Sequence, residues 1–501
     1  MKNIIILGGG TAGWLTALYL KKFTTHNITV IENPNIIPII AGESSGANFS
    51  RILKVLNLFD KDFILNTNCT PKLGSIFYDW KSVGENFVHG LIDGYYDQDY
   101  LNEYSGLTSH YDFLKSCIAN NLKNEDIFFN CNLIKNNKIP ITDNGEINTV
   151  MWHICSRSTA NYFKKIGLQR NINLIEGEYS HCKRNNKGDI ESLTLKDNKE
   201  IVGDFFFDCS GFARLLLFKE LKCTYKIYEN LFTANKVLAW WESDVKKINH
   251  TKIYAMKYGW SWNINLQNRS GNGYLYDDTL INYDQALEEA EKKFNTKITP
   301  VANLKFTPML SKEIWKNNVI AIGISGGFLE PLEANGLAQI TYALELVERY
   351  WNLNENNDFQ KEKFNKHMNE ANEEIIDFLL MHYKSGRNDT AFWKKHQEDK
   401  TTYTKSLDEK LVRWKNGMFY ENEKDCLIFN LESWAQVAIG LNLINKSKLR
   451  ENLMQKNINI VDNFNIYQKN LNSIITDTSD KCKSTDEWFK YINSINSKEG
   501  K

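Results

Sequence analysis

The sequence has no excess of charge of either sign. Its 501 residues include 61 Lys and Arg against 61 Asp and Glu, so the formal net charge at pH 7 is zero. Nucleic-acid binding depends largely on cationic side chains that contact phosphates. The balance therefore argues against a nucleic-acid partner and favours a small neutral molecule, while assembly into a homo-oligomer stays open.

Paired cysteines, metal-binding clusters and long apolar runs are missing as well. The nine cysteines form no Cys-x-x-Cys pair and no grouping with histidine, which predicts reduced thiols, no bound metal and a cytoplasmic location. The first apolar run, 4–7, ends at three glycines and is far too short for an export signal or a membrane span. Prolines number only seven, and no proline-rich linker divides the chain. We expect two closely apposed domains and no membrane contact.

A glycine-rich turn follows the first predicted strand. The run 4–7 is typical of a buried strand, and 14–22 has the spacing of a helix that packs back on it. Their connection fits Gly-x-Gly-x-x-Gly and consists of Gly8, Gly9, Gly10, Thr11, Ala12 and Gly13. Such a turn places bare backbone N–H groups and the positive end of a helix against a pyrophosphate. A second strand, 28–32, ends in Glu32, where an acid binds a ribose hydroxyl.

Two later turns favour FAD over a nicotinamide dinucleotide. The apolar strand 204–208 ends in Asp208, as in flavoproteins whose late strand closes over the cofactor. The strand 318–322 leads into a turn at Gly323 that brings backbone towards a flavin ring. Each could be a simple tight turn by itself. Together with the first turn they predict an α/β, Rossmann-like FAD-binding domain.

The rest of the chain predicts a second sheet and a helical cap. Residues 1–335 are expected to form the FAD-binding module, with an antiparallel substrate sheet inserted at roughly 85–150 and 225–300. A mostly helical substrate cap is expected at 336–501, with a polar tail at 463–501 that ends frayed. Apolar spacing predicts its helices at 337–350, 359–382, 406–420 and 445–456.

Four motifs resemble the flavin-dependent tryptophan halogenase family. They are Gly8–Trp14 (GGGTAGW), Gly42–Ser45 (GESS), Gly259–Ile264 (GWSWNI) and Phe328–Glu333 (FLEPLE). They follow the family's order between residues 4 and 443, although Asn265 replaces the proline that ends the third motif. The resemblance implies a flavin monooxygenase type of fold, FAD used as FADH2 with O2, a halide ion (chloride, bromide or iodide) and a separate flavin reductase. It also places Gly42 and Glu43 among the FAD-binding residues.

By this resemblance, Lys72 takes the place of the family's catalytic lysine, eight residues before Trp80, and Glu333 that of its active-site glutamate. Hypohalous acid is a modest electrophile, so an amine that hydrogen-bonds it or becomes a haloamine must stand beside the attacked ring carbon. A carboxylate can orient the amine and accept the proton of the cationic ring. Lys72 and Glu333 are therefore expected to converge. The alternatives are a surface lysine and an acid that complements a helix dipole.

The resemblance also implies positions for the halide and for a flavin shield. The family binds halide with backbone N–H groups that match Asn335 and Gly336, but its preceding serine is Ala334 here. Without that hydroxyl, we expect bromide or iodide to work at least as well as chloride. Trp260 and Trp262 are expected to keep the organic substrate off the flavin, with a packed core pair as the alternative.

The substrate region departs from enzymes that halogenate free tryptophan. The segment that holds the amino-acid backbone is short, because 429–434 runs directly into an apolar helix. Trp434 and His89 are expected to line the substrate pocket, although a lone histidine is as often structural. Glu432 stays an alternative ammonium anchor. The predicted substrate is a small electron-rich aromatic, indole-like rather than tryptophan.

Two other functions stay open. A flavin-dependent aromatic hydroxylase would share the fold, FAD and oxygen chemistry, but it would turn over without halide. A catalytically silent FAD-binding protein would account for departures from the family at Ala47, Asn265, Ala334 and Ala391. The retained Lys72 favours a flavin-dependent halogenase, an oxidoreductase, over these two alternatives.

Overall fold

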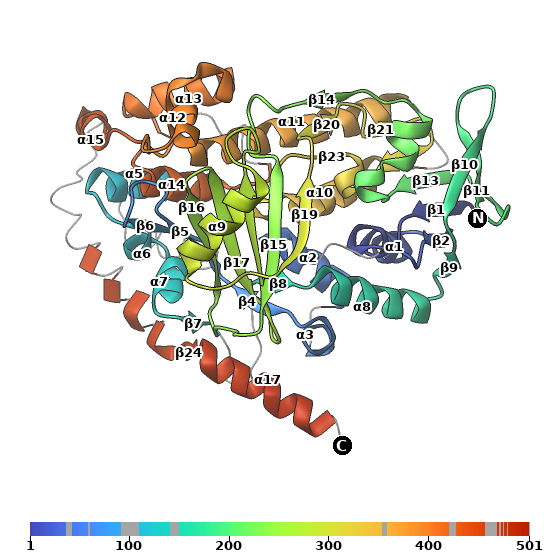
Figure 1. Ribbon diagram of the computed structural model, residues 1–501, viewed down its shortest axis with the longest axis horizontal. Coiled ribbons are helices and arrows are strands. Elements are labelled where there is room, and N and C mark those ends of the chain that lie inside the picture. The colour runs from blue at the N-terminus through green and yellow to red at the C-terminus, as the bar shows by residue number, and fades with distance from the viewer. Residues whose placement is uncertain are drawn as a thin grey trace. The chain divides into compact units, whose positions relative to one another are not determined.

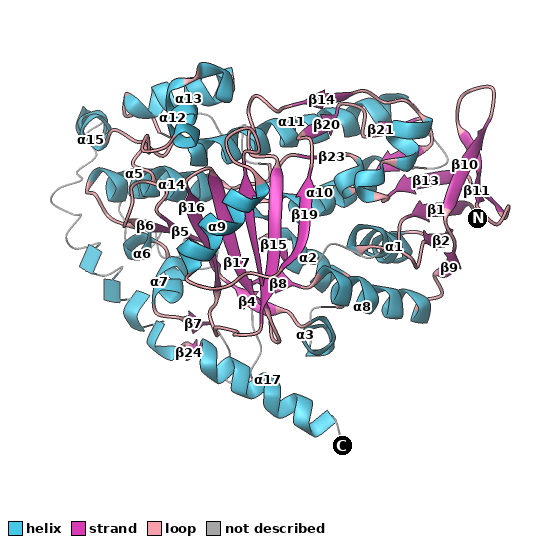
Figure 2. Ribbon diagram, in the orientation of Figure 1, coloured by secondary structure: helices cyan, strands magenta, loops and turns pink. Residues whose placement is uncertain are grey.

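The computed structural model describes residues 1–36, 43–58, 61–91, 110–140, 150–352, 358–419, 427–455, 468–469, 472–473, 475–477 and 479–499. The chain divides into two compact units. The first comprises Met1–Cys69, Ile154–Asn235 and Lys305–Glu373, and the second comprises Thr70–His153, Lys236–Leu304 and Glu374–Lys501. Each unit combines sheets with helices (Figure 2).

The helices and strands of the first unit lie in three stretches of the chain. They are β1 (Asn3–Leu7), α1 (Thr11–Phe23), β2 (Asn27–Glu32), β3 (Glu43–Ser44), α2 (Ala47–Val55), α3 (Lys61–Thr67), α8 (Ser156–Gln169), β9 (Asn173–Glu176), β10 (Tyr179–Arg184), β11 (Ile190–Leu195), β12 (Glu200–Val202), β13 (Phe205–Asp208), β14 (Tyr225–Ile227), β20 (Met309–Ser311), β21 (Trp315–Lys316), β22 (Val319–Ala321), β23 (Gly327–Phe328) and α10 (Asn335–Tyr350). The long helix α11 (Asp358–Tyr383) begins in the first unit and ends in the second.

A six-stranded sheet forms the core of the first unit, in the order β21-β22-β13-β1-β2-β9 (Figure 1). All neighbours in it are parallel except β21 and β22. Parallel strands are covered on both faces and need continuous apolar runs, and the three phenylalanines of β13 are fully buried. The strands predicted at 4–7, 28–32, 204–208 and 318–322 are confirmed as β1, β2, β13 and β22.

The second unit is built around a larger sheet. Its elements are β4 (Thr70–Lys72), β5 (Gly74–Tyr78), β6 (Asn86–Gly90), α5 (His110–Ala119), α6 (Asn124–Ile127), α7 (Phe129–Lys135), β7 (Lys138–Ile139), β8 (Met151–Ile154), β15 (Lys236–Glu242), β16 (His250–Met256), β17 (Gly259–Asn265), β18 (Ser270–Tyr276), α9 (Tyr283–Phe294), β19 (Pro300–Lys305), α12 (Ala391–Glu398), α13 (Lys405–Lys415), α14 (Leu431–Gly440), α15 (Lys446–Gln455), β24 (Lys483–Ser484) and α17 (Thr485–Glu499).

Seven strands pair in the order β19-β15-β18-β17-β16-β5-β6. The long strands β15 to β18 pair in antiparallel fashion, whereas β5 joins β16 in parallel. An antiparallel substrate sheet was predicted at roughly 85–150 and 225–300; β6 lies in the first range, and β15 to β18 lie in the second. The segment 110–135 is helical instead, in α5, α6 and α7.

The helix predictions differ from the structure at one place. The helices predicted at 337–350, 359–382 and 445–456 are confirmed as α10, α11 and α15. The one predicted at 406–420 ends at Lys415, because Gly417 takes a left-handed φ of 74° and closes the helix. The frayed end expected for the tail falls on residues 500 and 501, which lie outside the described residues, so it stays a prediction. The division at residue 335 into an FAD module and a substrate cap stays a prediction.

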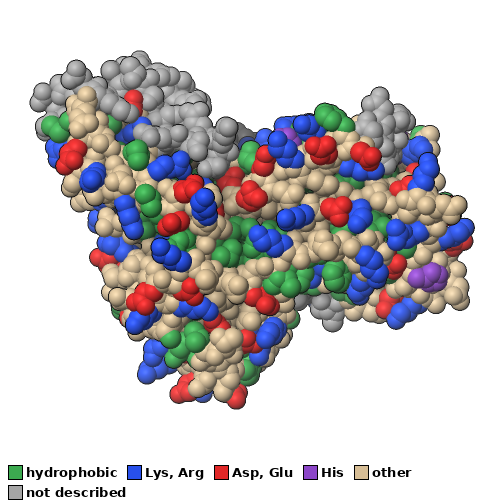
Figure 3. Space-filling view, turned by 90° about the horizontal axis from the view of Figure 1, so that it is seen from above, with side chains coloured by type: hydrophobic (Ala, Val, Ile, Leu, Met, Phe, Trp, Pro, Cys, Tyr) green, Lys and Arg blue, Asp and Glu red, His purple; other side chains and the backbone are tan. Residues whose placement is uncertain are grey.

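Charges of both signs are mixed on the face of the molecule that Figure 3 shows, where Lys and Arg are interspersed with Asp and Glu. In the part of the chain that the structure describes, no helix has the length and apolar character needed to span a bilayer. The same residues contain no group of three or more His, Cys, Asp or Glu side chains that could hold a metal ion.

Candidate active site

The turn between β1 and α1 depends on glycine. Gly8 has a φ of 127°, and a Cβ there would lie 2.2 Å from the carbonyl oxygen of Cys209. A Cβ on Gly13 would lie 1.8 Å from the carbonyl oxygen of Gly8. At Gly10, the N-cap of α1, a Cβ would meet nothing within 4 Å, and no side chain caps the helix. The start of α1 therefore has open space beside Gly10 and no side-chain cap, which fits a pyrophosphate.

Glu32 lies over this turn at the end of β2. A Cβ on Gly9 would be 2.3 Å from the Cγ atom of Glu32. The Glu32 carboxylate accepts a hydrogen bond from the indole of Trp14 at 3.4 Å and pairs with the ammonium of Lys164 at 3.2 Å. Helices α1 and α8 thus hold the acid beside the turn. The hydroxyl of Thr11 joins the same helices by donating to the carbonyl of Ser156 at 3.3 Å.

Asp208 fixes the two later turns. Its buried carboxylate accepts hydrogen bonds from groups that follow it in the chain, which belong to Ser210, Leu216 and Leu217. The hydroxyl of Ser325 donates to the carbonyl of Asp208 and ties the turn after β22 to the end of β13. In that turn Gly323 has a φ of 74°, and a Cβ on it would lie 3.5 Å from the Cβ of Ala12. The turns after β1, β13 and β22 therefore meet at one edge of the sheet.

The backbone before α10 is strained. Glu333 and Ala334 both have left-handed φ angles, 59° and 56°, which cost about 1–2 kcal/mol for each residue with a side chain. Asn335 returns to a φ of −59°. Such a change of hand aims successive N–H groups at one point and makes a concavity for an anion. No side chain caps α10, and a Cβ on Gly336 would meet nothing within 4 Å. The amide of Asn335 fastens the loop by donating to the carbonyls of Glu330 and Leu332.

Glu43 belongs to the segment beside this loop, because β3 contacts residues 332–334. Burial raises the pKa of the Glu43 carboxyl group, and a hydrogen bond with the Ser156 side chain opposes the shift. A carboxyl group that is more easily protonated repels a nearby anion less. Gly42 lies outside the described residues.

Lys72, in the second unit, is buried, with 4% of its surface exposed. It ends β4 and lies opposite Met151 of β8. An ammonium group is costly to bury, so an inaccessible lysine requires compensating contacts or a function. The positive charge of Lys72 reaches His153, because it lowers the pKa of that histidine, second only to the effect of burial.

The protonation of His153 follows from its neighbours. Its Nδ1 lies 3.2 Å from the hydroxyl of Thr70, and its Nε2 lies 2.8 Å from the hydroxyl of Thr251. Thr70 donates its own proton to the carbonyl of Asn265 at 2.6 Å. Thr70 must therefore accept from Nδ1–H, and Nε2 accepts from Thr251. His153 is fixed as one neutral tautomer.

Trp260 and Trp262 share one face of β17. Their ring centroids are 5.5 Å apart, and both side chains are buried. The indole of Trp260 donates to the hydroxyl of Tyr383 at 3.0 Å. Opposite Trp262 on β18, a Cβ on Gly273 would lie 2.1 Å from the indole, so only glycine leaves room for the ring.

His89 and Trp434 meet at one ring of α11. Their ring centroids lie 6.0 and 5.0 Å from that of Phe378, and Phe429 stacks on Phe378 at 3.9 Å. Gln436 holds α14 against β6, because its amide bonds both backbone groups of Gly90. The structure thus joins the two predicted pocket residues in an aromatic cluster. Phe378 and Phe429 were not predicted, since their spacing is equally typical of packed core.

Known proteins resemble this chain over most of its length. Residues 3–455 match the family described as tryptophan halogenase. The chain belongs to the tryptophan halogenase family. It is 26% identical over 457 residues to tryptophan 6-halogenase SttH of Streptomyces toxytricini, covering 82% of this chain and 84% of the relative.

Solved structures share the mixed α/β fold of this halogenase. Xcc4156, a flavin-dependent halogenase from Xanthomonas campestris, superposes with a TM-score of 0.84 at 23% identity and 98% coverage of both chains. BrvH, a flavin-dependent halogenase from Brevundimonas sp. BAL3, superposes with a TM-score of 0.81 at 24% identity. The match covers 98% of this chain and 99% of BrvH. The family assignment confirms a flavin-dependent halogenase, an oxidoreductase that acts on aromatic compounds. FAD and a halide are therefore implied, and the open α1 N-terminus fits the pyrophosphate of the flavin.

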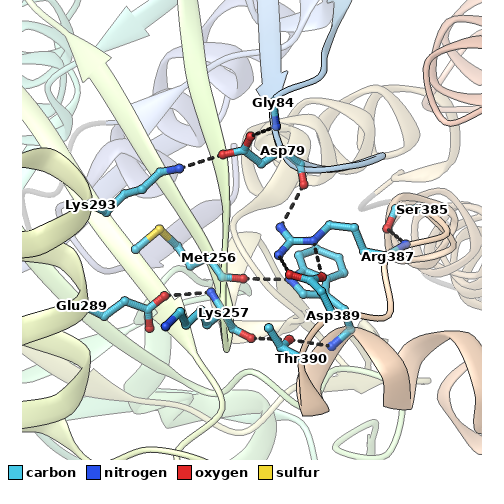
Figure 4. A network of polar contacts seen from close by, with 11 residues as sticks. Asp79, Gly84, Met256, Lys257, Glu289, Lys293, Ser385, Arg387, Asp389 and Thr390 are labelled. Atoms are coloured by element: carbon cyan, nitrogen blue, oxygen red, sulfur yellow. Dashed lines mark hydrogen bonds and ion pairs between the residues drawn. The ribbon is translucent and has the colours of Figure 1, made fainter.

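Two charged residues that hold distant segments of the chain together were not predicted from the sequence. Arg387 bonds both carboxylate oxygens of Asp389 at 2.8 and 2.7 Å and donates to the carbonyl of Asp79 at 2.9 Å (Figure 4). The buried carboxylate of Glu374 accepts three backbone hydrogen bonds, from Leu427, Ile428 and Phe429, at 2.6, 3.0 and 2.8 Å. The preceding residue, Glu373, is exposed. Nothing in the sequence distinguishes the two acids.

Proposed function

We propose that this protein uses FADH2, O2 and a halide to halogenate a small electron-rich aromatic, such as an indole, that lacks an amino-acid backbone. The observation that carries the proposal is the buried lysine, Lys72, in a family of halogenases. A surface lysine would need no such burial.

The residues of the first unit would hold the cofactor. The turn Gly8–Gly13 and the first turn of α1 bind the pyrophosphate, and Glu32 binds a ribose hydroxyl. The segment Gly42–Glu43 and the turns at Asp208 and Gly323 complete the site. Reduced FAD supplies, with O2 and halide, the hypohalous acid. Delivery of the reduced flavin by a separate reductase is part of the proposal.

The halide would bind at the start of α10. Its donors would be the N–H groups of Asn335 and Gly336, which follow two left-handed residues in a turn that suits an anion. Ala334 offers no hydroxyl to a small, strongly hydrated anion. Bromide and iodide, which lose their hydration more easily than chloride, are therefore expected to work at least as well.

Lys72 would direct the halogen. Its amine hydrogen-bonds hypohalous acid or becomes a haloamine, and the ring carbon that it faces is attacked. Glu333 would orient the amine and accept the proton of the cationic ring. The convergence of these two side chains is a prediction, and their roles are separable by substitution.

The aromatic clusters would bind and shield the substrate. His89, Phe378 and Trp434 offer flat apolar surfaces to a planar ring. The buried pair Trp260 and Trp262 would separate this ring from the flavin and so prevent its direct oxygenation.

The test is product analysis with a flavin reductase. Indole, phenols and tryptophan are each supplied with chloride, bromide or no halide, and products are identified by mass spectrometry. We expect a halogenated indole or phenol from the wild type and none from Lys72→Ala, with FAD still bound. Lys54→Ala, an exposed lysine of α2, is the matched control. An oxygenated ring formed without halide would instead identify an aromatic hydroxylase.

A further inference from the structure

A second lysine faces an aromatic ring in a different part of the second unit. The Nζ atom of Lys384 lies 3.6 Å from the ring centroid of Tyr403. Lys384 follows α11, and Tyr403 precedes α13 (Figure 1). Both side chains are half-buried. An amine placed over a phenol ring repeats the arrangement proposed for Lys72 and its substrate.

The pair lines a cavity of about 520 Å³. Exposed side chains form part of its lining, those of Ser82, Glu85, Val412 and Lys415. A solute as small as hypohalous acid can therefore reach the amine from solvent. Lys72 is not among the residues that line this cavity.

The environment of Lys384 favours a reactive amine. Its Nζ donates to the backbone carbonyl of His396. Burial lowers the pKa of Lys384 to about 8, against the opposing charges of Asp408 and Asp399 and with a smaller contribution from Lys415. A fraction of the amine is therefore uncharged near neutral pH and carries a free lone pair.

We infer that Lys384 and Tyr403 form a trap that captures hypohalous acid escaping from the enzyme's own reaction and stores the halogen on the tyrosine ring. The proposed function supplies the acid, and the inference rests on it in that respect. The site is thus a place of self-modification, and its ligand class is an electrophilic halogen oxyacid.

The chemistry takes two steps. The amine nitrogen attacks the halogen, an N–X bond forms, the O–X bond breaks, and the hydroxide leaves as water with an amine proton. The halogen then passes to the carbon next to the phenol hydroxyl, so a C–X bond forms and the N–X bond breaks. The proton of that carbon returns to the lysine nitrogen. One hypohalous acid is reduced, and one ring carbon is oxidised.

The geometry suits the second step, because aromatic substitution takes place at the face of the ring. A haloamine formed on a nitrogen above the ring keeps its halogen beside that face, within reach of a small rotation of the lysine side chain. The chain contains a matched comparison: Nζ of Lys226 lies 4.9 Å from the ring centroid of Tyr228, and the Lys226 side chain is exposed. Tyr228 is half-buried, as Tyr403 is.

The first test uses the full-length protein without flavin. Limiting hypobromite is added, and bromine is located by peptide mass spectrometry. We expect Tyr403 to take up about tenfold more bromine than Tyr228, because the transfer is intramolecular. Lys384→Arg keeps a cation over the ring but removes the amine, and it should lower the labelling of Tyr403 to that of Tyr228. Equal labelling of both tyrosines, or unchanged labelling in Lys384→Arg with an unchanged melting temperature, overturns the inference.

The second test uses turnover with bromide, indole and a flavin reductase. Bromine should accumulate on Tyr403 as the number of cycles rises, until the two carbons next to its hydroxyl are occupied, and Tyr403→Phe should leave position 403 unlabelled. If brominated indole forms while Tyr403 stays unmodified, the trap is refuted. If no brominated indole forms, the proposed function fails, whereas the reaction with added hypobromite still decides the reactivity of the pair.

Discussion

Nδ1 of His153 lies 3.2 Å from the hydroxyl of Thr70, two residues before Lys72 on the same strand. Because Thr70 gives its own proton to the carbonyl of Asn265, the histidine is the donor in this contact. A neutral imidazole thus ties the strand of Lys72 to Thr251 on the neighbouring β16. We expect His153 to act as a positioning residue for Lys72.

Replacing His153 should show whether it positions Lys72 for the reaction or contributes to binding of substrate and FAD. In His153→Ala, the hydroxyls of Thr70 and Thr251 lose a buried partner, and we expect the free energy of unfolding to fall by about 1–3 kcal/mol. We also expect kcat to fall by about tenfold or more, since small displacements of a reacting group are costly. KM and FAD affinity should stay near the wild-type values, and His153→Gln should recover part of kcat. The exposed His181→Ala is the control; an equal loss in it would refute the role of His153.

Ala334→Ser should shift halide preference. The added hydroxyl can donate to the halide and helps most with chloride, so the ratio of chlorinated to brominated product should rise severalfold. Competition between the two halides in one reaction measures the ratio. Ala334→Gly relieves the left-handed backbone without adding a donor and should stabilise the fold by up to about 1 kcal/mol. A similar halide shift in Ala334→Gly would assign the effect to the backbone instead.

Glu374→Gln should loosen the segment before α14. An amide offers one acceptor oxygen where the carboxylate oxygens accept three backbone N–H groups, so we expect a loss of about 2–4 kcal/mol in unfolding free energy. Because Phe429 belongs to this segment, KM for the aromatic substrate should rise more than kcat falls. The neighbouring Glu373→Gln changes the same charge on an exposed site. The proposal for Glu374 fails if both variants behave alike in thermal unfolding and in KM.

His396 should make the protein sensitive to mild acid. Burial, followed by the charge of Lys384, lowers the pKa of His396 from 6.5 to about 3. Below pH 6.5, His396 binds a proton in the unfolded chain but stays neutral in the folded chain. The free energy of unfolding therefore falls by about 1.4 kcal/mol per pH unit as the pH drops from 6.5 towards 3. His396→Phe retains an aromatic ring and removes the titrating imidazole. Its melting temperature should fall less between pH 7.5 and 5.5 than that of the wild type, and parallel curves would contradict the prediction.

The first unit was largely predictable, since its signals are local. Glycines that the backbone requires at Gly8 and Gly13 mark the strand-turn-helix start, and β13 is a continuous apolar run. The role of Asp208 was harder to predict from the sequence. Its carboxylate accepts hydrogen bonds from backbone N–H groups of the following turn. A residue type at a strand end predicts a site but does not say whether the side chain binds a ligand or supports the turn.

The second unit depended more on contacts between distant parts of the sequence. His89 and Trp434 were predicted to line the substrate pocket, which stays a prediction, whereas their shared contact with Phe378 was not predicted. Helix α13 was predicted too long because the apolar spacing continues past Gly417, whose left-handed backbone ends it. The convergence of Lys72 and Glu333 stays a prediction, since no local pattern in either segment encodes it.

The two left-handed residues at 333 and 334 set limits on how this enzyme can be altered. In a saturation library at position 334, variants with β-branched side chains should be lost because these residues are strained at a left-handed φ. This loss would come from misfolding and not from an effect on halide chemistry. Glycine and asparagine should be the most readily accepted. Directed evolution of halide preference at position 334 could therefore use only a few amino-acid types. Positions with an ordinary backbone conformation would tolerate a wider range of substitutions.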